Sequence, residues 1–589
     1  MQAPDSSSRV LNAPNLNYLW ATAIVEELTR QGVGLFVLAS GSRCSPFTLA
    51  VAGQPGVHRI QHVDERGCGF AAVGYARATG RAAVVITTSG TAVANLLPAV
   101  MEASEDGLPL VVLSADRPAR LRNTGANQTM DQVDLFGTHV RWFHDLACPN
   151  PGIPVEHVLS LVGDACRATR LDRPGPVHLN CMLDEPLQPV SGPDPVSISR
   201  DVVRWAEGEA PWNPPEASTS SSRLPEPLAA TIRAARRGVL LIGRLQGECE
   251  VRAVQQLAAR LGWPVLADIT SGLRLGGSLP HRIACADALL SEERWLARHR
   301  PDVVVQVGRR LVSKLLQAFA AHESDTYLVV CPDSRPLDPH HAVTHRVTMN
   351  LSSFCEQVPL EGVSTDPGWT AAWEAASHDV QLSLSAWEEE QTQVNEPGIA
   401  RSITRCIPAG HGLFVGNSMP VRDLDQFGVA DGPSVAVAAN RGVSGIDGTV
   451  LSAVGYAAGR RSPVTLLLGD LSLVHDLNGL LALARSETPI TVVLVNNRGG
   501  GIFHFLPIAE TAGEAFEPWF GTPHDIHFSH AAALVGLDYL SPGTMEEFRT
   551  AYAHAVQSGR SSVLEVRTDR VDNVDLHRAL WKQLRNASL

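Results

Sequence analysis

Apolar and polar positions alternate along the chain in a pattern that predicts an α/β protein. In the first part of the sequence, Trp20, Ile24 and Leu28 recur at helical spacing, and Asn17 is placed to cap that helix. Continuous apolar runs between the helices are typical of buried parallel strands, and they lie at 35–39, 83–87, 110–113 and around 176–180. This first block ends near Pro186.

Two stretches without periodicity divide the rest of the chain. The first, 212–227, is rich in Pro, Ser and Glu, and the second is 358–367. A helix is predicted at 251–261, and strands are predicted at 239–242, 264–267, 303–307, 327–331, 464–468, 490–495 and 563–566. The pattern predicts three doubly wound parallel-sheet domains, with the boundaries 1–190, linker 191–225, 226–357, linker 358–370 and 371–589.

Composition narrows the range of partners. A formal net charge of −13 disfavours nucleic acid or an anionic membrane as the main partner, and anionic substrates would need locally gathered positive charge. Ten cysteines without a CxxC pair predict reduced thiols and a cytoplasmic protein. The polar N-terminus has no signal-peptide core, and no apolar run approaches the roughly 20 residues that span a bilayer. We therefore expect neither export nor membrane insertion.

Polar residues follow two neighbouring strands of the third block. The strand at 464–468 runs into Gly469 and Asp470, and the strand at 490–495 runs into Asn496, Asn497 and the glycines 499–501, with a helix predicted at 476–484 between them. This right-handed crossover brings Asp470 and Asn497 to one edge of the sheet. Their side-chain oxygens, with the carbonyl of Gly499, suit a divalent cation that also binds phosphate oxygens. The alternative is a polar strand end followed by a loose glycine loop.

Glu65 is the second candidate for chemistry. It follows the stretch 57–61 and precedes a small-residue helix predicted at 69–78. Taken alone, Glu65 also fits a helix N-terminus, where a carboxylate interacts favourably with the helix dipole. Together, the Gly-Asp and Asn-Asn pairs resemble the thiamine-diphosphate motif. In such enzymes a glutamate in an apolar pocket, here Glu65, bonds the pyrimidine ring of the cofactor.

Further motifs make the resemblance more specific. They are Gly41-Ser42-Arg43 and the segments 62–66, 87–92, 115–118, 125–129, 416–418, 440–442 and 445–448. On these motifs the chain resembles the 2-succinyl-5-enolpyruvyl-6-hydroxy-3-cyclohexene-1-carboxylate synthases, thiamine-diphosphate transferases of menaquinone biosynthesis, along nearly its whole length. The resemblance implies a pyrimidine-binding domain, a central Rossmann-like domain and a diphosphate-binding domain. It also implies decarboxylation of 2-oxoglutarate and addition of the succinyl unit to isochorismate, with Mg²⁺ or Mn²⁺.

The resemblance also assigns roles to individual residues. The implied catalytic residues are Glu65, Asn127, Gln128, Arg422 and Arg441. The implied substrate-binding residues are Ser42, Arg43, Arg117, Gln128, Lys314, Ser418, Arg422 and Arg441. The implied cofactor-binding residues are Glu65, Thr88, Ser418, Met419, Ile446, Gly469, Asp470, Leu471, Ser472, Asn497, Gly499, Gly501, Ile502 and Phe503, of which Asp470, Asn497 and Gly499 would hold the metal. Core packing is the alternative for the apolar side chains of Ile446, Ile502 and Phe503.

Charge gives an independent check on these roles. Both implied substrates are dicarboxylates, and arginine pairs with carboxylates in bidentate fashion. Three positions depart from the family pattern: Ser40 replaces a proline, Leu315 stands where a second basic residue is common, and Arg498 stands where an acidic residue is common. Arg309 and Arg310, just upstream, could compensate for Leu315.

Three other readings remain open. The chain could be another thiamine-dependent 2-oxo acid enzyme of the acetolactate synthase type, or a binding protein that keeps the fold without the chemistry. Dinucleotide binding by the second block rests on Gly243 and Gly308 without a GxGxxG motif. The resemblance implies a dimer or a dimer of dimers in which Glu65 of one subunit faces Asp470 of another, while an intramolecular arrangement also fits the sequence.

Overall fold

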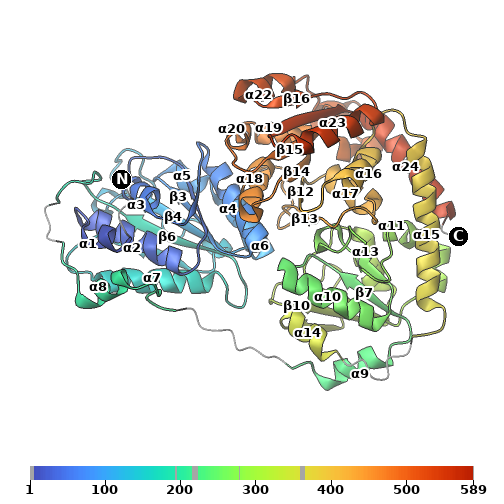
Figure 1. The fold of residues 1–589 in the computed structure, drawn as a ribbon, viewed down its shortest axis with the longest axis horizontal. Coiled ribbons are helices and arrows are strands. Elements are labelled where there is room, and N and C mark those ends of the chain that lie inside the picture. Colours follow the sequence, from blue (N-terminus) through green and yellow to red (C-terminus); the bar gives the residue numbers. More distant parts are fainter. Residues whose placement is uncertain (1–5, 193–195, 215–222, 278, 359–364, 588–589) are drawn as a thin grey trace.

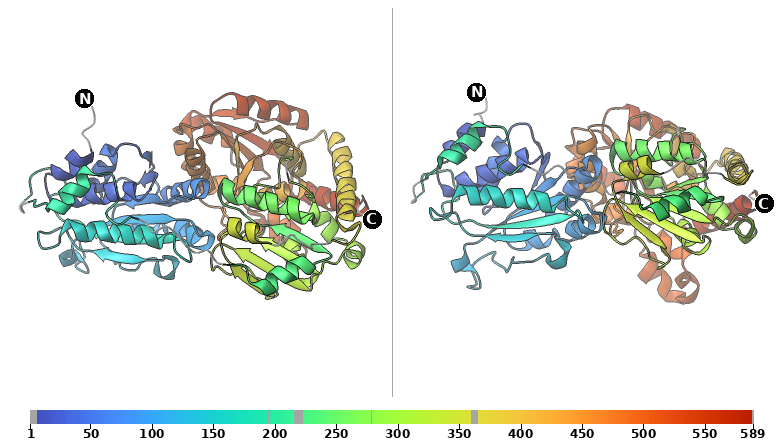
Figure 2. Two further views of the ribbon diagram at one scale, coloured as in Figure 1. Left: turned by 60° about the horizontal axis from the view of Figure 1, so that its bottom comes forward. Right: turned by 90° about the horizontal axis from the view of Figure 1, so that it is seen from below.

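Three parallel β-sheets, each covered by helices, form three domains along the chain (Figure 1). The computed structural model describes residues 6–192, 196–214, 223–277, 279–358 and 365–587. The first domain lies to one side of the other two and meets them at the side that carries α4 and α6 (Figures 1 and 2). The α/β class predicted from the sequence pattern is confirmed.

The first domain contains a six-stranded sheet with the order β2-β1-β3-β4-β6-β5. Its central strands are buried on both faces, as their unbroken apolar runs predict. In chain order, its elements are α1 (Ser6–Leu11), α2 (Leu16–Arg30), β1 (Leu35–Leu38), α3 (Ser45–Gly53), β2 (His58–Gln61), α4 (Glu65–Thr79), β3 (Ala83–Thr87), α5 (Thr91–Ala94), α6 (Leu97–Asp106), β4 (Leu110–Asp116), β5 (Phe143–Leu146), α7 (Val155–Ala168), β6 (Pro176–Met182) and α8 (Arg200–Glu207).

The middle domain contains a five-stranded sheet with the order β11-β10-β9-β7-β8. Its elements are α9 (Glu226–Ala234), β7 (Gly238–Ile242), α10 (Gly247–Leu261), β8 (Val265–Ala267), α11 (Ala286–Leu290), α12 (Glu293–Arg298), β9 (Val303–Val307), α13 (Lys314–His322), β10 (Thr326–Cys331), β11 (His345–Thr348) and α14 (Leu351–Gln357). Its strand order reverses between β7 and β9, as in other doubly wound sheets.

The third domain has the sheet order β13-β12-β14-β15-β17-β16. Numbered from its own first strand, this order is the same as that of the first domain. Its elements are α15 (Trp369–Glu389), α16 (Glu396–Cys406), β12 (Gly412–Val415), α17 (Met419–Phe427), β13 (Ala436–Ala438), α18 (Thr449–Arg460), β14 (Val464–Gly469), α19 (Asp470–His475), α20 (Gly479–Ala484), β15 (Ile490–Asn496), α21 (Ile508–Thr511), α22 (Phe528–Val535), β16 (Asp538–Leu540), α23 (Met545–Gln557), β17 (Ser562–Arg567) and α24 (Arg570–Ala587). The long helix α15 and the C-terminal helix α24 pack against each other and the middle domain (Figure 1).

Helices α4 and α18 cross in close contact and join the first domain to the third. Their apolar side chains belong to one buried cluster that continues into both sheets. Small residues permit the crossing: a Cβ atom added at Gly74 would lie 1.9 Å from the carbonyl oxygen of Ser452, and one added at Gly455 would lie 1.8 Å from that of Ala71. The backbones of the two helices therefore touch.

A buried charged cluster lies where the three domains meet. Arg77 bonds the carboxylates of Glu102, at 2.9 Å, and Asp106. Arg244 of the middle domain also binds Asp106, at 2.8 Å. Glu102 accepts hydrogen bonds from the backbone N–H groups of Gly442 and Val443 in the third domain. Helix α6 is thus tied to both neighbouring domains.

Some local expectations were wrong. Helix α2 begins two residues earlier than predicted: Asn15 caps it, whereas Asn17 lies inside it and donates to the backbone carbonyls of Asp184 and Pro186. The helix expected at 476–484 is shorter, since α20 covers only Gly479–Ala484, and a separate helix, α19, precedes it and begins at Asp470 itself. The segment 191–225, expected to be a linker, contains α8, because Val202 and Trp205 pack on the core of the first domain.

Candidate active site

The third sheet changes strand order between β12 and β14, the place where doubly wound sheets bind ligands. Strands β12, β14 and β15 are parallel neighbours. The residues just after them, namely Asn417, Asp470 and Asn497, therefore meet at one edge of the sheet. The structure brings together the two side chains that the sequence analysis singled out for a metal.

The buried side-chain oxygens at this edge of the sheet do not all have hydrogen-bond partners among the described residues. Asp470 accepts from the backbone N–H of Leu471 through Oδ1, at 2.6 Å, and from that of Gly499 through Oδ2, at 3.0 Å. Burial raises the pKa of Asp470, an effect that these N–H groups oppose. Asn497 donates through Nδ2 to Glu396 at 3.3 Å, but its buried Oδ1 has no partner among the described residues. An unpaired buried acceptor costs about 1–3 kcal/mol. This donor set fits a hard divalent cation.

The loop before α18 is held from the same edge. Asp476 accepts from the N–H groups of Gly448 and Val450, both at 2.9 Å. Ser472 donates to the carbonyl of Ile446 at 2.5 Å. Burial raises the pKa of Asp476 to about 6. The segment after Asp470 therefore fixes the backbone at half-buried Ile446, one of the predicted cofactor-binding residues.

Glu65 is the first residue of α4 and is half-buried. Its Oε2 accepts from Asn95 at 3.4 Å. The residues on either side reach the third domain: Asp64 accepts from Asn478 at 2.8 Å, and Arg66 donates to the carbonyl of His475. Glu65 therefore borders the segment that follows Asp470. It is a helix N-terminal carboxylate as well, so the two readings of Glu65 are compatible.

Two arginines meet at the strand ends of the first domain. Burial lowers the pKa of Arg43, and the charge of nearby Arg117 lowers it further. Arg117 donates to Ser89 Oγ at 2.8 Å and to the carbonyl of Asn127 at 2.9 Å. Gln128 is fastened to Ser89 through its backbone carbonyl and its side-chain amide. The predicted residues Arg117, Asn127 and Gln128 thus lie together around Ser89, and Arg43 lies near Arg117.

A second pair of arginines lies at the strand ends of the third domain. Burial lowers the pKa of Arg422, and the charge of Arg441 adds to that effect. Arg441 donates to Asn417 Oδ1 at 2.8 Å, and Arg422 donates to the carbonyl of Ser418. Among the described residues, neither forms an ion pair within 4 Å.

The remaining predicted residues occupy varied positions. Lys314 is exposed at the first turn of α13, away from any ion pair among the described residues. Exposed Ser42 follows Gly41, whose missing side chain lets the loop pass against Thr88. Phe503 lies edge-on to Phe520, with the ring centres 5.7 Å apart. The other predicted cofactor residues lie around the strand ends after β12, β14 and β15, and they are Met419, Gly469, Leu471, Ser472, Gly501 and Ile502.

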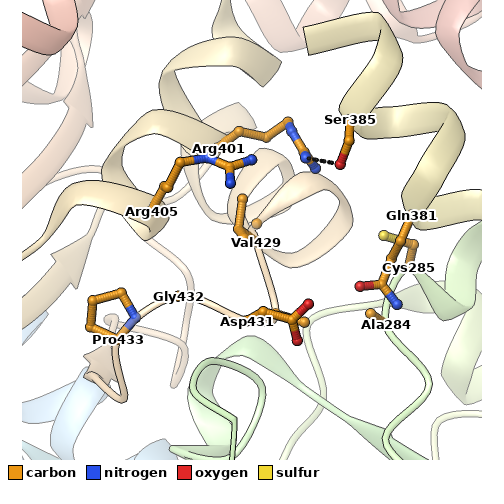
Figure 3. A pocket seen from close by; sticks show the side chains of 12 residues that line it. Ala284, Cys285, Gln381, Ser385, Arg401, Arg405, Val429, Asp431, Gly432 and Pro433 are labelled. Atoms are coloured by element: carbon orange, nitrogen blue, oxygen red, sulfur yellow. Dashed lines mark hydrogen bonds between the residues drawn. The ribbon is translucent and has the colours of Figure 1, made fainter. Parts of the chain in front are cut away.

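A cavity of about 450 Å³ lies elsewhere, between α15, α16 and the segment 428–433 (Figure 3). Arg401 and Arg405 line it, and both bond the carboxylate of Glu388 at 2.7 Å. Arg401 also reaches Ser385 at 3.4 Å (Figure 3). None of the predicted site residues lines this cavity.

Comparisons with known proteins agree with this geometry. Three family models match: the N-terminal thiamine pyrophosphate binding domain over residues 20–135, the thiamine pyrophosphate enzyme middle domain over 197–415, and the C-terminal binding domain over 431–566. A 2-succinyl-5-enolpyruvyl-6-hydroxy-3-cyclohexene-1-carboxylate synthase of Salinibacter ruber is 43% identical over 98% of each chain. That of Rubrobacter xylanophilus is 46% identical over 97% of this chain and 98% of its own. The chain belongs to this synthase family.

The contacts around the strand ends include three residues that were not among the predicted site residues. Asn417 anchors the loop before α18 through the carbonyls of Asn440 and Gly445, at 2.7 and 2.6 Å. Glu396 orients Asn497, and His524 lies beside Asp470. Asn417 stood inside a recognised motif and could have been found, whereas Glu396 and His524 come from distant segments without a local signal. In the described part of this synthase-family chain, no helix has the length and apolarity needed to cross a bilayer.

Proposed function

We propose that the enzyme releases carbon dioxide from 2-oxoglutarate and transfers the remaining four-carbon unit to isochorismate, giving 2-succinyl-5-enolpyruvyl-6-hydroxy-3-cyclohexene-1-carboxylate. One carbon–carbon bond of the oxo acid breaks, and one new carbon–carbon bond forms to the ring of the acceptor. The relatives carry the name of this product.

The arginines carry the proposal. Two dicarboxylate substrates bring four carboxylates to a protein with a net charge of −13. In the first domain, the charge of nearby Arg117 lowers the pKa of Arg43. In the third domain, the charge of Arg441 lowers the pKa of Arg422. Placing two like charges together in a partly buried site is unfavourable unless anions lie beside them. Arg43 has the carboxylate of Glu185 at 3.5 Å, whereas Arg117, Arg422 and Arg441 form no ion pair within 4 Å among the described residues. We assign Arg422 and Arg441 to the 2-oxoglutarate-derived unit, and Arg43 and Arg117 to isochorismate.

Thiamine diphosphate, when bound, supplies the carbanion chemistry that the decarboxylation requires. Asp470, the unpaired Oδ1 of Asn497 and the carbonyl of Gly499 would hold Mg²⁺ or Mn²⁺ against the diphosphate. Glu65, between residues that bind the third domain, would bond the pyrimidine ring. Asn127 and Gln128, exposed beside Arg117, would face the reacting carbons.

Separate assays of the two halves of the reaction test these roles. Carbon dioxide release from 2-oxoglutarate with an artificial electron acceptor reports the first half, and isochorismate consumption reports the whole. Arg117→Gln should raise the KM for isochorismate at least tenfold and leave the first half within twofold, because a charge-assisted hydrogen bond contributes about 1.5–3 kcal/mol. The exposed Arg120→Gln is the matched control. A faster reaction with pyruvate than with 2-oxoglutarate would contradict the proposal and favour an acetolactate synthase-like activity.

We also propose a homodimer or a dimer of dimers with active sites shared between subunits. The α4–α18 contact is intramolecular in the single chain. The segment 191–225 connects the first domain to the rest of the chain, so the same two surfaces could instead pair between two chains. Mixing the inactive variants Glu65→Gln and Asp470→Ala distinguishes the arrangements. A shared site regains activity on subunit exchange, because one of the two sites in the mixed dimer has both residues. An intramolecular site stays inactive.

All ten cysteines are unpaired. A reducing compartment maintains free thiols, and we propose the cytoplasm as the location of the enzyme.

A further inference from the structure

His524 lies beside the carboxylate of Asp470. It belongs to the segment between Gly521 and α22, which packs on the glycine turn after Asn497: the Gly500 N–H donates to the carbonyl of Gly521 at 2.8 Å, and a Cβ atom at Gly499 would meet that same oxygen at 2.1 Å. The imidazole ring also lies edge-on to Phe528, with the ring centres 5.9 Å apart. The position of His524 is therefore fixed by the same turn that contributes to the cation site.

The hydrogen bonds of the ring determine its tautomer. Nδ1 of His524 accepts from the backbone N–H of Ile526 at 3.2 Å, so Nδ1 has no proton. In a neutral imidazole, the proton then lies on Nε2. Nε2 is 3.3 Å from Asp470 Oδ2, and no aligned acceptor bonds it among the described residues. His524 can therefore donate to Asp470, but it cannot bind a cation through Nε2 without losing its bond to Ile526.

The lone pairs of Asp470 can now be assigned. A carboxylate has about four lone-pair positions, two on each oxygen. On Oδ2, the N–H of Gly499 occupies one position, and the Nε2–H of His524, whose nitrogen is 3.3 Å away, lies close enough to take the other. On Oδ1, the N–H of Leu471 occupies one. When His524 donates to Oδ2, the position that remains for a cation is on Oδ1, so Asp470 then binds the cation through one oxygen only.

We propose that His524 is a positioning residue that restricts Asp470 to one-oxygen coordination and thereby selects a small octahedral cation over Ca²⁺. Mg²⁺ and Mn²⁺ suit six single oxygen ligands, whereas Ca²⁺ is larger, takes six to eight and accepts carboxylates through both oxygens. Removing the donor at Nε2 frees a position on Oδ2 and permits the two-oxygen mode. This inference rests on the cation site of the proposed function and adds its selectivity.

Matched variants isolate the Nε2–H donor. His524→Asn keeps a polar atom near Nδ1 for the Ile526 N–H but is too short to reach Asp470. His524→Gln places an amide N–H near the Nε2 position. His527→Asn, an exposed histidine on the same segment, is the control. Electron paramagnetic resonance of Mn²⁺, with full-length protein and thiamine diphosphate, gives the Mn²⁺ affinity, and competition against Mn²⁺ gives those of Mg²⁺ and Ca²⁺.

We expect His524→Asn to weaken Mg²⁺ binding about tenfold, which is the usual effect of losing a group that orients a metal ligand. Ca²⁺ binding should stay the same or tighten, so the Mg²⁺ to Ca²⁺ preference falls about tenfold. His524→Gln and His527→Asn should stay within about twofold of the parent. Equal weakening of both cations, or no change, would overturn the inference. Absence of Mn²⁺ binding in the parent protein would instead overturn the proposed cation site.

Discussion

Gly74 and Gly455 lie where the backbones of α4 and α18 touch. Replacing either with alanine changes the stability, and the direction of the change tells whether helix propensity or the close crossing dominates. In an isolated helix, Gly→Ala stabilises by about 1 kcal/mol. At Gly74, however, the new Cβ would lie 1.9 Å from the carbonyl oxygen of Ser452. It must retreat by roughly 1.5 Å to reach ordinary van der Waals contact. The obstacle is backbone within a fully buried crossing, so no side chain can turn aside.

We expect Gly74→Ala to weaken the docking of the first domain on the third by about 2 kcal/mol, the middle of the range for overpacked cores. That loss corresponds to about a thirtyfold shift toward the separated domains. Because α4 begins at Glu65, the same shift displaces Glu65 from the segment after Asp470. Activity at saturating thiamine diphosphate should therefore fall along with the thermal unfolding temperature.

Two measurements check this prediction. Thermal unfolding gives the direction of the stability change, and titration with thiamine diphosphate gives the activity of the enzyme at saturation. Gly277→Ala is the control, because Gly277 is exposed and a Cβ atom there meets nothing within 4 Å. If Gly74→Ala unfolds at a higher temperature than the parent and keeps its activity, helix propensity dominates and the backbones of α4 and α18 do not touch at Gly74.

Other substitutions and conditions test further contacts. Arg77→Met leaves Glu102 buried without its cation, whereas Asp106 keeps Arg244, so the free energy of unfolding in denaturant should fall by about 3–5 kcal/mol. A loss under 1 kcal/mol would contradict this. Burial lowers the pKa of His178 to about 3 and of His577 to about 4, from 6.5. Both histidines stay neutral in the folded protein, whereas in the unfolded chain they take up protons below pH 6.5. The free energy of unfolding should therefore fall by about 2 kcal/mol for each histidine at pH 5 relative to its value well above pH 6.5. Denaturant unfolding at pH 7 and pH 5 measures this difference, and equal stabilities would refute it. Arg422→Gln should raise the KM for 2-oxoglutarate at least tenfold in steady-state assays while thiamine diphosphate affinity stays within twofold, and an unchanged KM would remove Arg422 from the binding role.

Local patterns in the sequence predicted most of the sheet, because buried parallel strands are continuous apolar runs. The strand expected at 464–468 is Val464–Gly469, and the one at 490–495 is Ile490–Asn496. Since the site lies at strand ends, predicting the strands also placed Asp470 and Asn497. The error at α2 has a different origin: both Asn15 and Asn17 could cap the helix, and the choice depends on the carbonyls of Asp184 and Pro186, far along the chain.

Residues that act through other side chains could not be predicted in this way. Glu396 follows the cap of α16, so by itself it resembles any acidic residue in a first helical turn. Only the fold places it against Asn497 Nδ2 and thereby turns Asn497 Oδ1 toward the cation site. His524 likewise lies in a segment without periodicity. The ligands of a site are found from motifs, whereas the groups that orient them depend on tertiary packing.

The equal strand orders of the first and third sheets explain why one site draws on both domains. Helix α4 lies between the second and third strands of its sheet, and α18 lies between the corresponding strands of the other. Their contact is reciprocal: Gly74 of α4 meets Ser452 of α18, and Gly455 of α18 meets Ala71 of α4. In each helix, the glycine comes three residues after the residue that the other helix's glycine meets. In this alignment Ala71 matches Ser452, so Glu65 matches Ile446, each six residues earlier. The carboxylate and the apolar residue expected to flank the cofactor thus occupy equivalent places on two related folds. The contact pairs equivalent surfaces of two similar folds, as a twofold interface between identical subunits does. The surfaces that join the two domains within one chain are therefore also suited to join two chains.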